Sequence, residues 1–200
     1  MNGPVETSDG AVVNEPRVLI RPSRDSDVEA MLAIYRHHIR RGVEEGVDDS
    51  GMPEPDDLRD RRKNLRSHRL PHLVASFGGE VVGYAYVVLF RKRPAYRYAV
   101  KHSIYVHHEH AGRGVGGLLM QELIDVCAAA GFRQMIAYID ATNEPSKRLH
   151  EAFGFEHAGI LKGVGYKYGR WTDSILMQRA LGTGDGVPPG ASDGTPIPQD

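Results

Sequence analysis

Apolar residues recur along this 200-residue chain in two periods, one typical of helices and one typical of strands. The helical period predicts four helices: one opened by a capping box at Ser26-x-x-Glu29, one beginning at Pro55, one over 118–130, and a short one from Asn143 to Gly154. Short apolar runs predict the strands 18–20, 72–77, 81–90, 99–106, 135–139, 155–161 and 174–181.

These elements follow the order β-α-α-β-β-β-α-β-α-β-β. The pair Gly78-Gly79 is suited to a two-residue hairpin turn, so the first strands are expected to be antiparallel. Strand 99–106, helix 118–130 and strand 135–139 form a βαβ crossover, which makes those two strands parallel. We therefore expect an α/β fold with a mixed, mostly antiparallel sheet of six to seven strands, flanked by about four helices.

Composition changes near both ends of the chain. Residues 1–16 are small, polar and acidic, and we expect a disordered N-terminal extension there. Residues 183–200 are rich in glycine and proline, and we expect a flexible tail. A single folded domain is predicted over 17–182, which is long enough to bury a core of its own.

Charge and cysteine content limit the class of protein. The formal net charge is −1, so nothing in the composition favours nucleic-acid binding. No apolar run approaches about eighteen residues and no basic-then-apolar leader is visible, so we expect no membrane span and no signal peptide. The single cysteine, Cys127, cannot form an internal disulfide, which fits a cytoplasmic location. Its place on the apolar side of helix 118–130 favours a core position over a nucleophile.

The most informative stretch is glycine-rich and lies between strand 99–106 and helix 118–130. Gly112-x-Gly114-x-Gly116 lets the backbone approach a ligand, and the first N–H groups of the following helix favour an anion. A Walker loop would need a Gly-Lys-Ser/Thr, and a dinucleotide loop should lie in the first βα unit. These residues alone leave two interpretations equally open, a phosphate site and a structural connector.

The order of elements and two motifs resemble the GNAT superfamily of N-acetyltransferases. The window Ala111 to Gly116 is similar to its Arg/Gln-x-x-Gly-x-Gly/Ala pyrophosphate loop, except that Ala111 replaces the leading Arg or Gln. Because such a loop holds phosphate through backbone N–H groups, this change should weaken binding rather than abolish it. The segment Asn143 to Phe155 is similar to a second signature of the superfamily.

The chain is more similar still to the phosphinothricin acetyltransferase-like branch of that superfamily. The resemblance runs over about 17–182 and is more specific for the family than for the substrate. The four motifs that carry it are Arg93 to Tyr98, His102 to His107, Asn143 to Phe155, and Gly165 to Asp173.

The resemblance implies a GNAT fold with acetyl-CoA as co-substrate. The strand before the glycine loop would pair with the pantetheine arm, and the backbone N–H of Val106 or His107 would donate to the thioester carbonyl. Asn143 would contact the pantetheine arm or nearby backbone. The side chain of Arg113 could contact the diphosphate or face solvent. The diphosphate would lie on the loop residues Gly112, Arg113, Gly114, Val115, Gly116 and Gly117.

Three residues are the expected catalytic set: His150, Lys101 and Tyr105. His150 stands where much of the superfamily has a tyrosine near the sulfur, and a histidine can give a proton to the thiolate or accept one from the amine. Lys101 stands where the branch has a glutamate thought to act as base through water. It shares a strand face with Ser103 and Tyr105, the face that meets substrate in the family.

The lysine leaves three explanations open. An ordered water and His150 could take the proton without a carboxylate, or Lys101 could bind a carboxylate or phosphinate of the substrate. Alternatively, the protein is a weak or altered enzyme. We favour the first two together, because a lysine ammonium accepts a proton only when its pKa is strongly lowered.

The substrate-binding residues implied by the resemblance are Arg93, Tyr96, Lys101 and Tyr105. Arg93 would suit an acidic group on the acceptor, and Tyr96 could equally be packed in its hairpin. The other substrate wall, residues 42–51, lacks the aromatic residue usual in the branch and carries acids instead, which favours an amino group or a polyamine.

A metal site is not expected. The chain has four histidines around the glycine loop, His102, His107, His108 and His110, but adjacent histidines do not converge on one ion. The expected function is therefore acetyl-CoA-dependent N-acetylation of a small-molecule amine, an amino acid or analogue, by a cytoplasmic homodimer. The alternatives are a protein or polyamine acetyltransferase and a non-catalytic acyl-CoA sensor of the same fold.

Overall fold

The computed structural model describes residues 17–40, 54–167 and 169–189, so the predicted N-terminal extension, most of the expected tail and the acidic loop 42–51 lie outside the described residues. The order of elements matches the one expected. Its strands are β1 (Leu19–Pro22), β2 (His72–Phe77), β3 (Glu80–Leu89), β4 (Ala99–Val106), β5 (Gln134–Asp140), β6 (Glu156–Lys167) and β7 (Arg170–Ala180). Its helices are α1 (Val28–Arg40), α2 (Pro55–Ser67), α3 (Val115–Ala129) and α4 (Glu144–Ala152), with short 3-10 turns at Asp25–Asp27, Pro94–Tyr96 and His108–His110.

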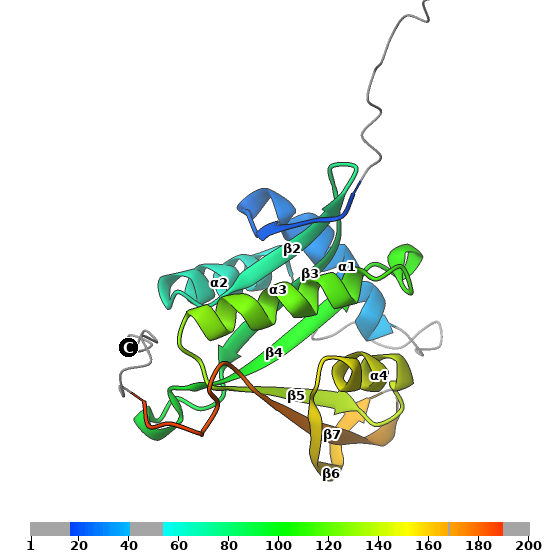
Figure 1. Ribbon diagram of the computed structural model, residues 1–200. Coiled ribbons are helices and arrows are strands. Elements are labelled where there is room, and N and C mark those ends of the chain that lie inside the picture. Colours follow the sequence, from blue (N-terminus) through cyan, green and yellow to red (C-terminus); the bar gives the residue numbers. More distant parts are fainter. Residues whose placement is uncertain (1–16, 41–53, 168, 190–200) are drawn as a thin grey trace, which may run out of the picture.

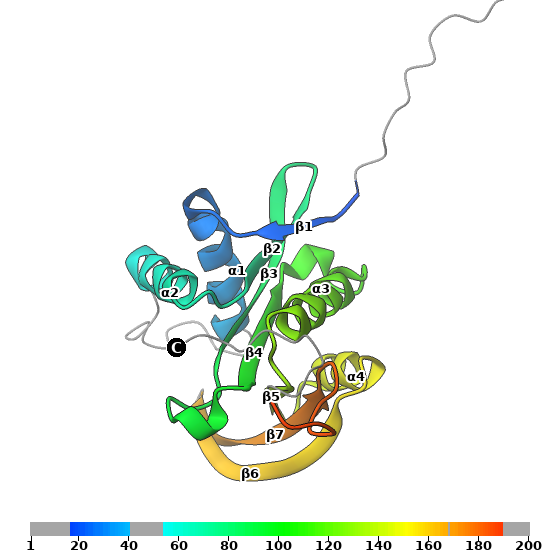
Figure 2. The same cartoon turned by 60° about the vertical axis from the view of Figure 1, so that its left-hand side comes forward.

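The strands form one seven-stranded sheet in the order β1-β2-β3-β4-β5-β7-β6. Every neighbouring pair is antiparallel except β4 and β5, as the crossover through α3 predicts. Helices α3 and α4 cover one face, and α1 and α2 cover the other (Figures 1 and 2). This confirms the mixed α/β class and gives the higher of the two expected strand counts.

Strands β4 and β5 are paired over only three residues each. The pairs are Ala99 with Gln134, Val100 with Met135, and Lys101 with Ile136. Beyond Lys101 the two strands diverge, and Figure 1 shows them joined at one end and separated at the other. The rest of β4, from His102 to Val106, therefore has a strand neighbour only on its β3 side.

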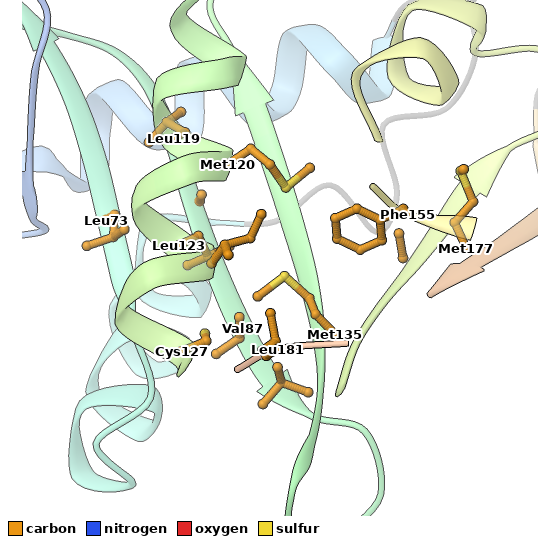
Figure 3. Packing of buried hydrophobic residues seen from close by; sticks show 14 of the residues in the cluster. Leu73, Val87, Leu119, Met120, Leu123, Cys127, Met135, Phe155, Met177 and Leu181 are labelled. Atoms are coloured by element: carbon orange, nitrogen blue, oxygen red, sulfur yellow. The ribbon is translucent and has the colours of Figure 1, made fainter. Parts of the chain in front are cut away.

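The larger core lies between α3 and the sheet. Of the five positions predicted to face inward, Leu119, Leu123 and Cys127 are fully buried, whereas Val126 and Ala130 are half-buried. Figure 3 shows the three buried residues, with Met120, packed near sheet residues that include Val87 and Met135. Burial raises the pKa of the Cys127 thiol to about 12, which agrees with a core role.

Helix α3 begins three residues earlier than predicted. Val115 is its first residue and is 1 % exposed, whereas Leu118, the predicted start, is 46 % exposed. The apolar period conceals this start because Gly116 and Gly117, which carry no side chain to show which face they are on, form part of the first turn.

A second core fills the space between the sheet and helices α1 and α2. It combines aliphatic residues of the helices with the buried rings of Tyr84 and Tyr86 on β3. The members that are themselves buried are Val28, Met31, Leu32, Ile34, Leu58, Leu65, Val74, Tyr84 and Tyr86.

Three local predictions are wrong. The capping box is not Ser26 with Glu29: the Asp27 carboxylate accepts a hydrogen bond from the Arg24 N–H at 2.7 Å and pairs with Arg21. The run of basic residues in α2 predicts a solvated face. Arg62 is nevertheless only 7 % exposed, because its guanidinium bonds to Ser23 at 3.0 Å and to Asp25.

The third error concerns the last hairpin. The glycines at 163, 165 and 169 predict a loop between short strands, but β6 continues to Lys167 and pairs Tyr166 with Trp171 of β7. The register shift between Leu161 and Gly165 accommodates Gly163 as an irregularity inside the strand, and Gly169 lies in the turn before β7.

Within the described residues, no helix is both long enough and apolar enough to cross a membrane.

Gly83 on β3 tests how tightly α3 is seated. A Cβ there would lie 3.0 Å from the Tyr105 carbonyl oxygen and 3.1 and 3.2 Å from Leu119 and Val115. We expect Gly83→Ala to lower the free energy of unfolding by about 1–3 kcal/mol through overpacking, measured by denaturant titration. Gly117→Ala is the control, because its Cβ would meet only Phe153 at 3.6 Å. Equal stability of both variants would contradict this packing.

Candidate active site

The glycine loop ends in a helix start that suits an anion. Gly112 and Gly114 have φ values of 74° and 80°, a left-handed backbone that favours glycine, and Gly114 is the N-cap of α3. The first bond of the helix runs from the Leu118 N–H to the Gly114 oxygen at 3.1 Å. The N–H groups of residues 115–117 therefore have no partner within the helix, and its first turn holds no acid.

The side chains of the predicted loop residues are arranged in two ways. Arg113 is exposed, with Gly112 and Gly114 on either side, so it is available to a ligand or to water. Val115 points inward, and a Cβ on Gly116 would meet Leu149 of α4 at 3.3 Å. The loop is thus anchored by packing at 115–116 and open at 112–114.

The peptide groups of β4 alternate between its two sides. The Phe90 N–H donates to the Ala99 oxygen at 3.0 Å, and the His107 N–H donates to the Val82 oxygen at 2.9 Å, so odd-numbered residues bond to β3. The peptide groups of Ile104 and Val106 consequently face the side that β5 has left. The Val106 oxygen there is 2.8 Å from His38 Nε2 of α1.

Because of this alternation, the two N–H groups expected to donate to the thioester carbonyl, those of Val106 and His107, face opposite sides of β4. The His107 N–H is already engaged with Val82, whereas the Val106 N–H points into the gap between β4 and β5. The His107 ring is also occupied, since its Nδ1 accepts from the Glu109 N–H at 3.3 Å. The geometry therefore favours Val106 over His107 as the donor.

His150 is buried and paired with a second buried histidine. His150 and His102 are 4 % and 5 % exposed, and their Nε2 atoms are 3.1 Å apart. His150 Nδ1 is 2.6 Å from the Ser146 oxygen, which can only accept, so this nitrogen carries a hydrogen. In a neutral His150, Nε2 is then an acceptor and His102 Nε2 is the donor.

Burial keeps both rings neutral. It lowers the pKa of His102 to about 3, helped by repulsion from His150, and it lowers the pKa of His150 although the bond to Ser146 opposes this. His102 Nδ1 is a buried nitrogen without a hydrogen-bond partner in the described structure. The sequence prediction missed this pairing, although His102 lies on the same strand face as Val100 and Ile104, which pack under α3.

The opposite face of β4 carries Lys101, Ser103 and Tyr105, as the strand period predicts. Burial raises the pKa of Tyr105, so its phenol stays protonated. Arg61, in the basic run of α2, is half-buried and donates to the Tyr86 hydroxyl at 3.2 Å. This face therefore presents phenols and a guanidinium.

Lys101 lies toward the gap. Its Nζ is 5.3 Å from the centre of the Tyr138 ring on β5. Arg93 and Tyr96 belong to the turn that precedes β4, at the joined end of β4 and β5, and in the described structure neither bonds to Lys101 or Tyr105. The ring of Tyr96 packs edge-on against Phe90, with centroids 6.0 Å apart, and the residue is 37 % exposed. Tyr96 is therefore partly packed in its hairpin, the second of the two roles that the sequence left open.

Asn143 caps α4. Its Oδ1 accepts from the Ser146 N–H at 3.2 Å, so its side-chain oxygen has a structural partner, whereas no described residue bonds to its Nδ2. The histidines near the loop stack on one another, with His107 and His108 centred 4.4 Å apart. Among the described residues, no three His, Cys, Asp or Glu side chains are grouped to hold a metal.

The buried histidine pair makes stability depend on pH. Between its ordinary pKa of about 6.5 and its folded value of about 3, His102 binds a proton only when unfolded, so stability is complete above pH 6.5 and falls as the pH falls. We expect the unfolding free energy to drop by about 1–2 kcal/mol from pH 6.5 to pH 5, measured by denaturant titration. His102→Gln, which keeps a donor for His150, should flatten this slope; an unchanged slope would contradict the buried neutral pair.

Comparison with known proteins shows which family this fold and site resemble. Residues 32–155 match the model of the acetyltransferase (GNAT) family. A phosphinothricin N-acetyltransferase of Alcaligenes faecalis is 42 % identical over 167 residues, covering 83 % of this chain and 84 % of that protein. An L-methionine sulfoximine/L-methionine sulfone acetyltransferase of Pseudomonas aeruginosa is 36 % identical over 167 residues, covering 81 % and 94 %.

A solved structure agrees with these matches. The phosphinothricin acetyltransferase of Sinorhizobium meliloti, crystallised in complex with AcCoA, superposes with a TM-score of 0.81 at 36 % identity, covering 92 % of this chain and 99 % of that one. The extent of these matches and the diverging β4 and β5 beside the glycine loop lead to one conclusion: the chain belongs to the acetyltransferase (GNAT) family.

Proposed function

We propose that this protein is an acetyl-CoA-dependent N-acetyltransferase whose acceptor is the amine of an amino acid or of an analogue of the phosphinothricin or methionine sulfoximine type. The observation that carries the proposal is the open edge of β4, where the Val106 N–H faces the gap left by β5 beside an anion-binding helix start. The acceptor class is supported by the names of relatives that cover most of the chain.

The residues present fit acetyl-CoA. Gly112 to Gly117 would bind the diphosphate through backbone N–H groups, with Arg113 exposed beside them and the Asn143 Nδ2 free to donate to the pantetheine arm. When bound, acetyl-CoA supplies a thioester carbonyl that an amine can attack. The Val106 N–H would polarise that carbonyl oxygen, the kind of contribution that preorganised backbone donors make to acyl transfer.

We propose that His150 acts as a positioning residue paired with His102, because in this geometry the neutral ring has no hydrogen to give to the leaving sulfur. Because burial keeps it neutral, its single ring hydrogen is on Nδ1 and is held by the Ser146 oxygen. The Nε2–H of His102 would hold the His150 ring in place. A change in this pair should therefore alter both the orientation of His150 and its proton.

The opposite face of β4 would receive the acceptor. Lys101 would bind a carboxylate or phosphinate, and Tyr105 would orient the acceptor by hydrogen bonds because its phenol stays protonated. Arg61 adds a second cation to this face through its contact with Tyr86. Arg93 and Tyr96 would reach only an acceptor that extends toward the joined end of the two strands.

We also propose that the protein is a cytoplasmic homodimer. The β6–β7 hairpin exposes large apolar side chains that a second copy would cover. These side chains, with exposures of 39–69 %, are Ile160, Leu161, Val164, Tyr166 and Trp171. The cytoplasmic location rests on the single cysteine, Cys127, which is buried.

The experiment is a screen for release of free thiol from acetyl-CoA with a panel of amines. We expect turnover with phosphinothricin, methionine sulfone or sulfoximine, or an unmodified amino acid, and at least tenfold lower kcat/KM for the same amine without its carboxylate, because Lys101 would lose its partner. Preference for polyamines or a peptide would redirect the acceptor assignment. No release of thiol with any amine of the panel would contradict the proposed enzymatic function and would favour a non-catalytic acyl-CoA sensor.

A further inference from the structure

His38 bonds to Val106, the same residue whose N–H the proposed function places at the reacting centre. It belongs to the last turn of α1, and its Nε2 is 2.8 Å from the Val106 oxygen. Its ring packs against Tyr105, with centroids 5.6 Å apart and an angle of 65°, and against His37 at 6.1 Å. The imidazole therefore sits between the acceptor face of β4 and the gap that β5 leaves.

The hydrogen bond fixes the tautomer of this ring. A carbonyl oxygen only accepts, so His38 Nε2 carries the hydrogen, and a neutral ring has its lone pair on Nδ1. No residue in the described part of the chain bonds to Nδ1, and this atom is not among the buried unpaired nitrogens there. His38, which is half-buried, thus presents a ring nitrogen that accepts no hydrogen bond from a described residue.

An amine acceptor needs such a group, because it arrives as an ammonium and must lose protons to become an amide. The other described side chains on this face do not serve. Burial raises the pKa of both Tyr84 and Tyr105, so neither phenol ionises. Lys101 and Arg61 are cations. His72, the first residue of β2, is a weak base because burial lowers its pKa to about 4, and its ring stacks on Tyr84.

We propose that His38 is the general base of the reaction, accepting the acceptor's proton at Nδ1 through one water. The inference rests on the proposed N-acetyltransferase function. The ammonium carries three hydrogens and the product amide keeps one. As the nitrogen–carbon bond forms and the carbon–sulfur bond breaks, one proton ends on the sulfur and the other passes to His38 Nδ1 and then to solvent. No other reactant is required.

The bond to Val106 links this base to the thioester donor. The Val106 N–H and oxygen lie on the same side of β4, so the group that polarises the thioester and the group that holds His38 belong to one residue. Two titratable side chains of the described chain face the His38 ring, His37 from α1 and Tyr105 from β4. Because the Tyr105 phenol stays protonated near neutral pH, the control variant must be made at His37.

The test compares His38→Gln with His37→Gln. Glutamine keeps an N–H that can donate to the Val106 oxygen but has no basic nitrogen, while His37 is the adjacent, exposed ring that stacks on His108. We expect His38→Gln to lower kcat by about 100-fold at neutral pH with little change in the acetyl-CoA dissociation constant, and His37→Gln to behave like the wild type.

The pH profile and rescue separate a base from a structural residue. The deficit of His38→Gln should shrink at high pH, where the acceptor amine is already neutral and needs no base. Added imidazole should restore part of the activity of His38→Ala. A His38→Gln enzyme with the wild-type rate and profile would overturn the proposal while leaving the proposed function intact.

A second measurement does not depend on turnover or on how the variants fold. Long-range 1H–15N NMR of the free wild-type protein should show the neutral His38 ring as the tautomer with its hydrogen on Nε2. A His38 with its hydrogen on Nδ1 would overturn the proposal. A wild-type protein silent with every amine would overturn the proposed function and this inference with it.

Discussion

Strand β4 has neighbours on both sides only as far as Lys101, and the peptide groups beyond it on the β5 side must find other partners. Backbone N–H and C=O groups left unpaired near a protein interior are costly, so such an edge is either bonded within the chain or kept for a ligand. Here the Val106 oxygen is bonded by His38, while the Val106 N–H has no strand opposite it. The site follows from this divergence.

The divergence also separates two chemical environments across one strand. Even-numbered residues of β4 point toward α3 and α4, where His102 and His150 form a neutral, buried pair. Odd-numbered residues point toward α1 and α2, where Tyr105 meets phenols and Arg61. A thioester lying along the edge would therefore have the histidine pair on one side and the acceptor on the other.

The fold could be predicted from sequence because its signals are local. The strand and helix periods, the Gly78-Gly79 turn and the strand-glycine-helix order each depend on a few consecutive residues. The errors occurred where glycines hide an element, at the start of α3 and within β6, and where a tertiary contact decides burial, as for Arg62.

The site was predicted less completely, because contacts between distant segments cannot be predicted from local sequence. The loop residues and His150 stand in motifs, whereas the partners that set their chemistry come from distant segments. His102 meets His150 across 48 positions, and His38 meets Val106 across 68. The choice between Val106 and His107 depends on which side of β4 each amide faces, and this is fixed by the register with β3.

Amide hydrogen exchange tests the central claim, that the open edge of β4 receives the acyl donor. In the free protein the Val106 amide should exchange quickly and the His107 amide slowly, because only the latter is bonded to β3. Addition of acetyl-CoA should slow exchange at Val106 by at least tenfold and leave His107 unchanged. A Val106 amide whose exchange does not respond to acetyl-CoA would contradict the account.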